Sequence, residues 1–306
     1  MKNTVMSGQK ISIRDKMRSA IAIYRAHKNK IFSDVKTVIA YHEKLTGYLY
    51  KYTGLAAKEA RILDLGCGQT AAQTILFHTD GARVIGIDIE VPTYKMNIPI
   101  FFRVVKLNGV ERALKSLARH LLFDKEFFLK LSEEYGKPLV FENIDVRIVD
   151  AKSMMFESSS FDLIFSTAVF EHIDDVLGAV KEVDRVLKPS GIGMISIHLF
   201  PSMSGGHCLE WIFPDRFSSS KIPPWDHLRD NKYSPNTYLN KLTINQYRDI
   251  FRSCTNVIEE ETVKEGEKFL SKELELELGK KGYSKEDLLT RAVTFFIKKR
   301  ALEPVL

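Results

Sequence analysis

The chain has 306 residues, 44% of them hydrophobic, which is enough to fill the core of one large or two small soluble domains. Forty-five basic residues against 39 acidic ones give a net charge of +6, which modestly favours anionic partners but falls short of the dense basic patch of a dedicated nucleic-acid-binding protein. The three cysteines, Cys67, Cys208 and Cys254, show no Cys-x-x-Cys spacing, which argues against a disulfide framework and a structural zinc site.

The sequence contains no run of 18 apolar residues and no signal-peptide pattern, and its first ten residues, MKNTVMSGQK, are polar. We therefore expect a protein of the reducing cytoplasm that does not insert into a membrane. The oligomeric state does not follow from the sequence.

Residues 1–58 are predicted to form a helical N-terminal extension. From about residue 10 the segment lacks the alternation of a strand, and its apolar residues recur three and four positions apart, as on one face of a helix. These apolar positions are Met17, Ile21, Tyr24, Val38, Tyr41 and Leu45.

Residues 59–306 are predicted to form an α/β domain. Short β-branched runs alternate with helical segments from residue 61 onwards, which is typical of a parallel sheet covered by helices on both faces. The runs are RILDL, RVIGID, DVRIVD, FDLIFS and GIGMISIHL. Near the end of the chain a capped helix is expected from Thr243 to Phe251, a strand from Asn256 to Val263 and a last strand, RAVTFFIK, at 291–298.

Two segments interrupt this alternation. Residues 92–140 are predicted to be a helical insertion, in which Val110, Leu114, Leu117 and Leu121 mark an apolar stripe. Arg112, Lys115 and Arg119 form a cationic face on the same helix, either as solvated surface or facing a substrate. Residues 200–240 are rich in Gly, Ser, Pro and aromatic residues and are expected to form an ordered loop that carries binding residues.

A glycine turn joins the first strand to the following helix. Gly66 and Gly68 allow positive φ and close approach of the backbone to a ligand, as in the crevice of a doubly wound sheet. With Ala71 and with Asp88 about 20 residues on, the turn also fits the dinucleotide fingerprint, so an NAD site is a competing interpretation. Asp64 argues against it, because a carboxylate beside the turn disfavours a pyrophosphate and suits a ligand with an ammonium or sulfonium cation, such as S-adenosylmethionine.

Five motifs follow one another in the order and spacing of a known enzyme class. They are RILDLGCG (61–68), VIGIDIE (84–90), VDAKSMMF (149–156), FDLIFSTAVFEHI (161–173) and RVLKPSGIGMIS (185–196). Over roughly residues 60–200 the chain resembles class I S-adenosylmethionine-dependent methyltransferases, especially the methyltransferase type 11 group. The resemblance implies a Rossmann-like sheet of seven strands whose last strand is antiparallel, with the N-terminal helices and the insertion forming a cap over the crevice.

The resemblance also implies a set of cofactor-binding residues. Asp64 would orient the turn and contact the methionine end of S-adenosylmethionine, while the backbone at Gly66, Cys67 and Gly68 approaches it closely. Asp88 would accept both ribose hydroxyls, since a carboxylate has two acceptor oxygens, and Ile89 follows it. The family turn commonly has a third glycine where this chain has Thr70.

Further along the chain, the resemblance places Asp150 at the adenine amino group and the amide of Ala151 near the ring. Ser166 and Thr167, just past the fourth strand, would line the site beneath the reactive methyl group. The expected product is S-adenosylhomocysteine.

Methyl transfer from a sulfonium is an in-line displacement, so the enzyme mainly aligns the acceptor with the methyl group and excludes water. A hydroxyl acceptor also needs a general base. The candidate catalytic residues are His207, His172 and His198, and Glu171 is a candidate substrate-binding residue. Some relatives bind a divalent metal through an E-x-x-E-H pattern, but this chain has Ala168 at the first acid, so no metal is expected.

Trp225 and Arg229, in the loop motif PPWDHLR, suit a sugar ring and an anionic group and are further candidates for substrate binding. The favoured function is therefore methylation of a small or medium-sized acceptor, most plausibly at a hydroxyl, with a glycan or nucleotide sugar as one option. Alternatives are an RNA or protein methyltransferase, a non-catalytic S-adenosylmethionine-binding module and an NAD-dependent oxidoreductase. We expect no stable nucleic-acid complex.

Overall fold

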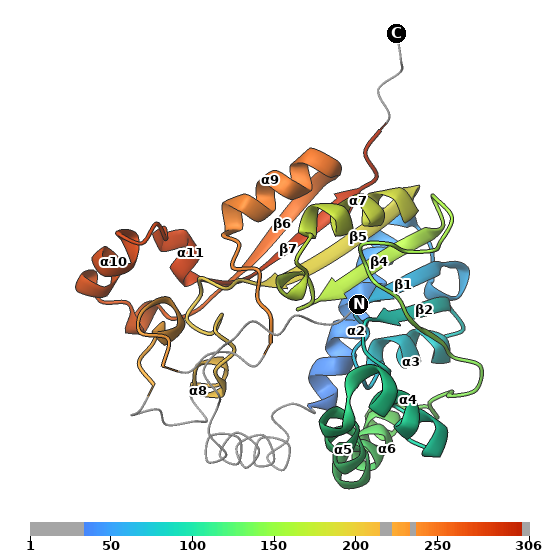
Figure 1. Cartoon of the computed structure of the whole chain (residues 1–306). Helices are drawn as coiled ribbons and strands as arrows, with labels where there is room; N and C mark the ends of the chain where they lie inside the picture. Colours follow the sequence, from blue (N-terminus) through green and yellow to red (C-terminus); the bar gives the residue numbers. More distant parts are fainter. Residues whose placement is uncertain (1–33, 215–221, 233–236, 302–306) are drawn as a thin grey trace.

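A computed structural model describes residues 34–214, 222–232 and 237–301, and it is built around one mixed sheet of seven strands (Figure 1). The strand order is β3-β2-β1-β4-β5-β7-β6. The strands are β1 (Arg61–Leu65), β2 (Arg83–Asp88), β3 (Asp145–Ile148), β4 (Phe161–Thr167), β5 (Leu187–His198), β6 (Asn256–Lys264) and β7 (Thr290–Lys298). Strands β1 to β5 are parallel, and β7 lies antiparallel between β5 and β6. The predicted seven-stranded sheet with its antiparallel last strand is confirmed.

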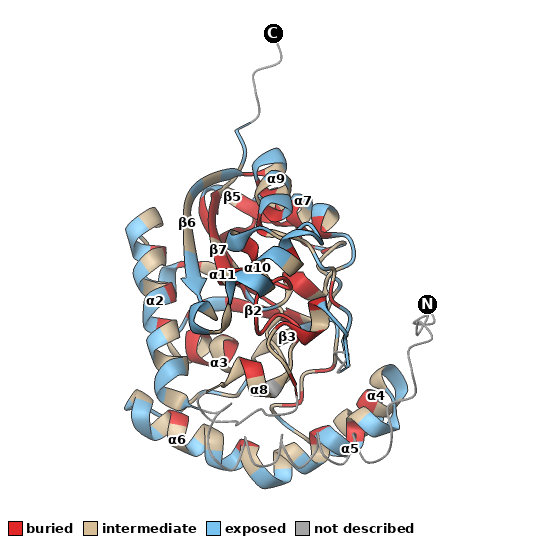
Figure 2. Ribbon diagram, turned by 90° about the vertical axis from the view of Figure 1, so that its left-hand side faces the viewer, coloured by how far each residue is buried: buried red, intermediate tan, exposed pale blue. Residues whose placement is uncertain are grey.

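Helices cover both faces of the sheet because successive side chains of a buried strand point to opposite sides. In β1, Ile62 packs on one face, with α2 (Val35–Thr53) and α3 (Ala72–Thr79). Leu63 packs on the other face, with α7 (Val176–Val186) and α9 (Ile244–Cys254). Figure 2 shows both layers of helices with the buried strands between them.

Of the predicted N-terminal extension, the structure describes the helix α2, which packs on one face of the sheet. In α2, Leu45 and Leu49 are buried against the sheet beside Phe296 of β7, so the helix is part of the face layer. Tyr41 is its link to the crevice, because the Tyr41 hydroxyl lies 2.6 Å from Oγ1 of Thr167 at the end of β4. The first predicted helical segment, with Met17, Ile21 and Tyr24, lies outside the described residues.

The predicted insertion is helical, but most of its apolar stripe does not lie on the side that packs inward. It consists of α4 (Ile98–Asn108), α5 (Val110–Arg119), a π-helical turn, η2 (His120–Asp124), and α6 (Lys125–Tyr135). Of the predicted stripe, Val110, Leu114 and Leu121 are more than half exposed and Leu117 is half-buried, whereas Ala113 and Ser116 face inward. Small side chains let α5 approach the sheet domain closely, and the helical period alone does not reveal which face is covered.

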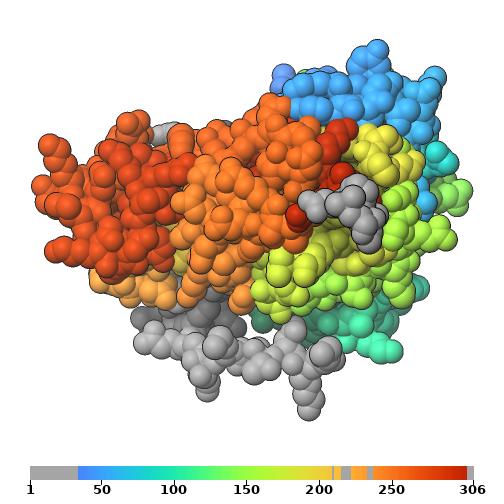
Figure 3. Space-filling view, turned by 90° about the horizontal axis from the view of Figure 1, so that it is seen from above, coloured from blue at the N-terminus to red at the C-terminus, as the bar shows by residue number. Residues whose placement is uncertain are grey.

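Besides the hydrophobic cores on the two faces of the sheet, the protein has another hydrophobic cluster that was not predicted. We call it the third hydrophobic cluster. It joins the loop after β5, including Trp211 and Trp225, to α10 (Lys272–Gly279) and α11 (Lys285–Leu289), which lie between β6 and β7 in the chain. The loop itself contains two short helices, α8 (Leu209–Ile212) and η4 (Asp226–Leu228). Figure 3 shows α10 and α11 projecting from one end of the molecule.

The remaining short helices are η1 (Ala57–Glu59), η3 (Phe170–His172) and η5 (Glu267–Phe269). Within the described ranges, none of the helices combines the length and the apolar character that a bilayer span requires.

Candidate active site

The glycine turn lies where the strand order reverses, at the carboxyl ends of β1 and β4, which is the usual ligand crevice of such a sheet. The amides of Gly66 and Cys67 both donate to the carbonyl of Ile87, at 2.8 and 3.0 Å, so the turn is fixed against β2. Gly66 has φ +81°, and a Cβ there would lie inside the van der Waals surface of Val169 Cγ2 and 3.0 Å from its Cγ1. Both the conformation and the close approach therefore require glycine at this position.

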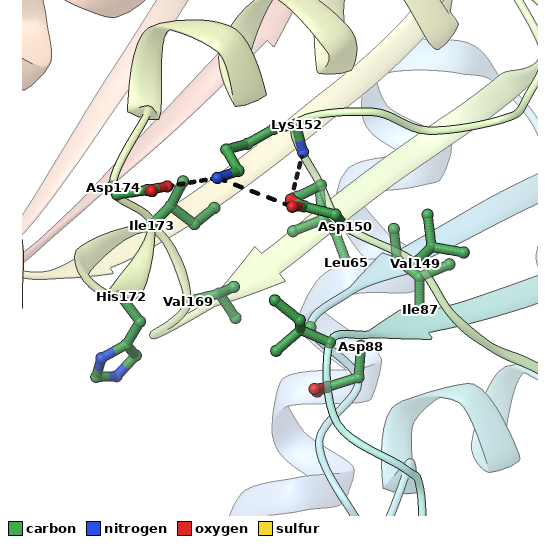
Figure 4. A pocket seen from close by; sticks show the side chains of 13 residues that line it. Leu65, Ile87, Asp88, Val149, Asp150, Lys152, Val169, His172, Ile173 and Asp174 are labelled. Atoms are coloured by element: carbon green, nitrogen blue, oxygen red, sulfur yellow. Dashed lines mark hydrogen bonds and ion pairs between the residues drawn. The ribbon is translucent and has the colours of Figure 1, made fainter. Parts of the chain in front are cut away.

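Asp88, at the end of β2, is tied to this turn. Its carboxylate accepts hydrogen bonds from the amides of Gly68 and Glu90, each at 2.9 Å. Burial raises the pKa of Asp88, and these two amides act in the opposite direction. The carboxylate lies at the cavity (Figure 4), in the place where the sequence predicts a ribose-binding acid.

Asp64 points into the protein rather than into the cavity. It is 4% exposed and accepts a 2.7 Å hydrogen bond from Oγ1 of Thr74 in α3. Burial raises its pKa to about 7, opposed by this hydrogen bond and reinforced by the charge of Asp88. The predicted role of orienting the turn agrees with these contacts, because Asp64 links β1 to the helix that follows the turn.

A cavity opens beside the turn, between the ends of β1, β2, β3 and β4 (Figure 4). Its apolar wall contains Ile87 and Val169, and its polar side contains Asp88, Asp150 and Lys152. Lys152 Nζ lies 2.6 Å from Asp174 and 3.8 Å from Asp150. The full lining is Leu65, Gly66, Ile87, Asp88, Ile89, Val149, Asp150, Ala151, Lys152, Val169, His172, Ile173 and Asp174.

The structure thus brings Gly66, Asp88, Ile89, Asp150 and Ala151, which are all predicted cofactor-binding residues, to one cavity. Other predicted residues lie around it. Ser166 is fully buried in β4, and Thr167 is exposed at the end of that strand and paired with Tyr41. Cys67 is half-buried in the turn, where burial raises its pKa.

The insertion braces the far side of the glycine turn through two arginines. Arg119 donates to Gln69 of the turn, to Thr93 at 2.9 Å and to the buried Asp124 at 3.1 Å. Arg112 pairs with Glu90, which follows Asp88 in the chain. Only the third member of the predicted cationic face, Lys115, is an exposed surface charge, paired with Glu111 four residues earlier. The face is therefore mostly structural.

A carboxylate and two imidazoles meet where β4 and β5 end. The ligand atoms of Glu171, His198 and His207 all lie within 4.8 Å of one another. Glu171 is in η3, directly after β4, and its neighbours Val169 and His172 line the cavity. His198 is the last residue of β5, whereas His207 comes from the loop that follows. We call Glu171, His198 and His207 the Glu171 cluster.

The Glu171 cluster is poorly solvated. Glu171 is 1% exposed, and burial raises its pKa to about 8, with the backbone amides of Glu171 and His198 opposing the shift. Burial lowers the pKa of His198 to about 3 and that of His207 to about 4, and the neighbouring histidines add to both shifts. Both imidazoles are therefore neutral at pH 7.

His172 borders the Glu171 cluster without belonging to it. Its Nδ1 lies 2.8 Å from the carbonyl oxygen of Tyr238, and its ring meets that of His207 edge to face at 5.2 Å between centroids. Because a carbonyl only accepts hydrogen bonds, Nδ1 is the donor in this contact.

Two of the predicted substrate-binding residues are placed differently. Trp225 is fully buried in the third hydrophobic cluster, and Arg229 donates to Glu277 in α10 at 3.0 Å. Neither lines the cavity. An aromatic residue in a Pro-rich loop suits a sugar and a small core equally well, and here the core formed by α10 and α11 takes it.

Comparison with known proteins agrees with this geometry. Residues 122–195, from η2 through most of β5, match a family model described as a methyltransferase domain. The chain therefore contains a methyltransferase domain. This match and the seven-stranded sheet support a class I methyltransferase fold, which implies S-adenosylmethionine as the cofactor.

No curated protein matches the chain. Among solved structures, the methyltransferase is similar to the PH0226 protein from Pyrococcus horikoshii OT3, with 15% identity, a TM-score of 0.45 and coverage of 89% of this chain and 96% of the other. A putative sarcosine dimethylglycine methyltransferase from Galdieria sulphuraria shows 18% identity and a TM-score of 0.45, over 85% and 86% of the two chains. An S-adenosylmethionine-dependent methyltransferase from Mesorhizobium loti shows 17% identity and a TM-score of 0.43, over 78% and 90%.

Sequence reasoning missed several residues of the methyltransferase site. Val169 packs over Gly66, Lys152 bridges two acids, and Arg119 holds Gln69 of the turn. Lys152 lies in the motif VDAKSMMF (149–156), so the sequence could have indicated it as a site residue. The partners of Val169 and Arg119 are distant in the chain and give no local signal.

Proposed function

We propose that this methyltransferase transfers the methyl group of S-adenosylmethionine to a hydroxyl of a small acceptor, and that the acceptor hydroxyl is activated at the Glu171 cluster. The observation that carries the proposal is the position of Glu171. It is a buried carboxylate next to two neutral imidazoles, and it lies between two cavity-lining residues in the chain. Polar groups that converge at an otherwise apolar crevice are the usual mark of a small-molecule site.

The reaction needs alignment and removal of one proton. The acceptor oxygen attacks the methyl carbon, the carbon–sulfur bond breaks, and its electron pair stays on sulfur to give S-adenosylhomocysteine. The hydroxyl proton passes to the carboxylate of Glu171, the most basic group of the Glu171 cluster, with a pKa of about 8. A neutral hydroxyl is a poor nucleophile, so a group that takes or displaces this proton adds a factor of about 10² to 10⁴ to the rate.

For the cofactor, we propose the roles that the sequence predicts. Asp88 would exchange its hydrogen bonds to the amides of Gly68 and Glu90 for the ribose hydroxyls. Ile89, Asp150 and Ala151 line the cavity where the adenine would lie. The turn at Gly66, Cys67 and Gly68 would contact the methionine part, with Ser166 and Thr167 below the methyl group.

The acceptor is proposed to be a metabolite rather than RNA. Arg112 and Arg119 are engaged by Glu90 and by Asp124, so they do not form the start of a phosphate-binding groove. The burial of Trp225 and the pairing of Arg229 with Glu277 remove the basis for naming a sugar. The three free thiols fit a cytoplasmic enzyme.

A panel of small hydroxylated acceptors, with matched amines and thiols, tests the proposal through release of S-adenosylhomocysteine. We expect turnover of a hydroxyl compound, and we expect Glu171→Gln to lower kcat by about 10² to 10⁴-fold. The affinity for S-adenosylmethionine should stay within twofold, since Glu171 does not line the cofactor cavity. Glu277→Gln, which removes a glutamate in α10, is the matched control and should retain full activity. Turnover of amines alone, or wild-type kcat in Glu171→Gln, would show the proposal to be wrong.

A further inference from the structure

We propose that the Glu171 cluster is a binding site for a divalent transition-metal ion, held by one oxygen of Glu171 and one ring nitrogen each of His198 and His207. The three ligand atoms come from different segments and lie within 4.8 Å of one another. Two imidazoles and one carboxylate are the donor set of catalytic zinc sites and of other divalent transition-metal sites with open positions.

Unsatisfied polar atoms in the Glu171 cluster support this inference. Among the described residues, neither carboxylate oxygen of Glu171 accepts a well-formed hydrogen bond, although the nearby amides of Glu171 and His198 favour its charged form, and Nε2 of His207 has no partner; all three atoms are buried. A buried polar group without a partner destabilises the fold, and a charged one does so more strongly. A cation between the three side chains would satisfy all of these atoms at once.

The third ligand is already oriented for such a role. Nε2 of His198 lies 2.8 Å from Oγ of Ser204, and this hydroxyl donates to Glu265 at 2.7 Å. Since the Ser204 proton goes to the carboxylate, Ser204 accepts from Nε2, and Nδ1 of His198 is left with a free lone pair. A ligating histidine typically donates its other nitrogen in this manner to a chain ending in a carboxylate.

The loop that carries His207 is tightly packed. A Cβ on Gly206 would come 2.6 Å from the His227 ring, and His227 Nε2 is itself 2.8 Å from the carbonyl of Phe200. The amide of His207 donates to the carbonyl of Ser204 at 2.9 Å, and His207 has φ +56°. The His207 ring stacks on His198 with 5.0 Å between centroids. The imidazole is thus presented by a rigid turn.

Binding of a metal ion would require the three side chains of the Glu171 cluster to move only a short distance toward one another. Ligand atoms around a tetrahedral Zn²⁺ lie about 3.3 Å apart, as bonds of about 2.0–2.1 Å dictate. The side chains, now within 4.8 Å of one another, would move together around the ion. Three protein ligands leave a fourth position open, and the ring of the ligand His207 contacts that of His172, which lines the cavity.

The metal site deepens the proposed function, and this part of the inference rests on it. An acceptor hydroxyl in the open position would lose its proton more readily, because a bound cation lowers the pKa of a coordinated oxygen. With the ion bound, the proton would pass to solvent instead of to Glu171, and the oxygen would then attack the methyl carbon as described above.

Metal binding is tested on the full-length protein without acceptor. After treatment with a chelator, the protein is titrated with Co²⁺ and the visible absorption of the bound ion is recorded, and Zn²⁺ is then used to displace it. We expect one equivalent of Co²⁺ with a tetrahedral or five-coordinate spectrum. Glu171→Gln and His207→Asn should each weaken binding at least 100-fold, and Ser204→Ala, which loosens His198, about 10- to 100-fold. His78→Asn is the matched control, since its Nε2 lies 2.8 Å from the carbonyl of Glu142, outside the Glu171 cluster.

Folding of each variant is checked by its melting curve without metal, and Zn²⁺ should raise the melting temperature of the wild type but not of Glu171→Gln. A Co²⁺ spectrum unchanged in both Glu171→Gln and His207→Asn, or no specific Co²⁺ spectrum in the wild type, overturns the metal site. Binding as expected in a protein that methylates only amines would leave the metal site standing and overturn the proposed hydroxyl acceptor instead.

Discussion

Gly66→Ala is expected to destabilise the methyltransferase by two separable effects. Gly66 has φ +81°, where an L-residue costs about 1–2 kcal/mol. The added methyl also overlaps Val169 Cγ2 and lies 3.0 Å from Cγ1, and forcing a group into packed space costs about 1–3 kcal/mol. The free energy of unfolding should therefore fall by about 2–5 kcal/mol. Urea denaturation monitored by circular dichroism measures this change.

Gly68→Ala is the internal control. Gly68 shares the positive φ, at +67°, but a Cβ there meets nothing within 4 Å, so only the conformational cost of about 1–2 kcal/mol remains. Adding Val169→Ala to Gly66→Ala should recover most of the packing cost and none of the conformational cost. The two mutations should thus show an interaction energy of about 1–3 kcal/mol in a double-mutant cycle. Equal losses in Gly66→Ala and Gly68→Ala would refute the packing argument.

Two further predictions concern charges around the turn. Because burial raises the pKa of Asp64 to about 7, Asp64 is neutral below that pH and anionic above it, so the affinity for the S-adenosylmethionine cation should rise about tenfold from pH 6 to pH 8. Calorimetric titration at both values measures the rise, and an equal pH dependence in Asp64→Asn would exclude this residue as its source. Arg119→Met leaves Asp124 buried without its main partner and should lower the free energy of unfolding by about 1.5–3 kcal/mol. Lys115→Met, which removes an exposed charge of the same helix, should change it by less than about 0.5 kcal/mol, and a similar loss in both variants would contradict the bracing role of Arg119.

Substitutions in the Glu171 cluster should change kcat, whereas the substitutions described above should change stability and cofactor affinity. Substitutions at the glycine turn and in the insertion should alter stability and cofactor affinity, because their contacts surround the turn. Substitution of Glu171 should alter kcat with little change in cofactor affinity. Measuring all three quantities on one set of variants separates the two halves of the site.

Several features of this protein were determined by the sequence itself. The β-branched runs located the central strands along the chain, because a strand buried on both faces must be apolar throughout. Gly66 marked the turn, since its conformation requires glycine, Asp88 followed from its spacing after that turn, and the resemblance to class I methyltransferases indicated Asp150.

Other features were decided only by the tertiary structure. The period of α5 showed an apolar stripe, but a helix is covered where its neighbour fits closely, and Ala113 and Ser116 rather than Leu114 face the domain. The place of Trp225 depended on α10 and α11, which supply the rest of its cluster. The Glu171 cluster exists because two strand ends and one loop converge in space, and such convergence is a property of the folded sheet that no local pattern encodes.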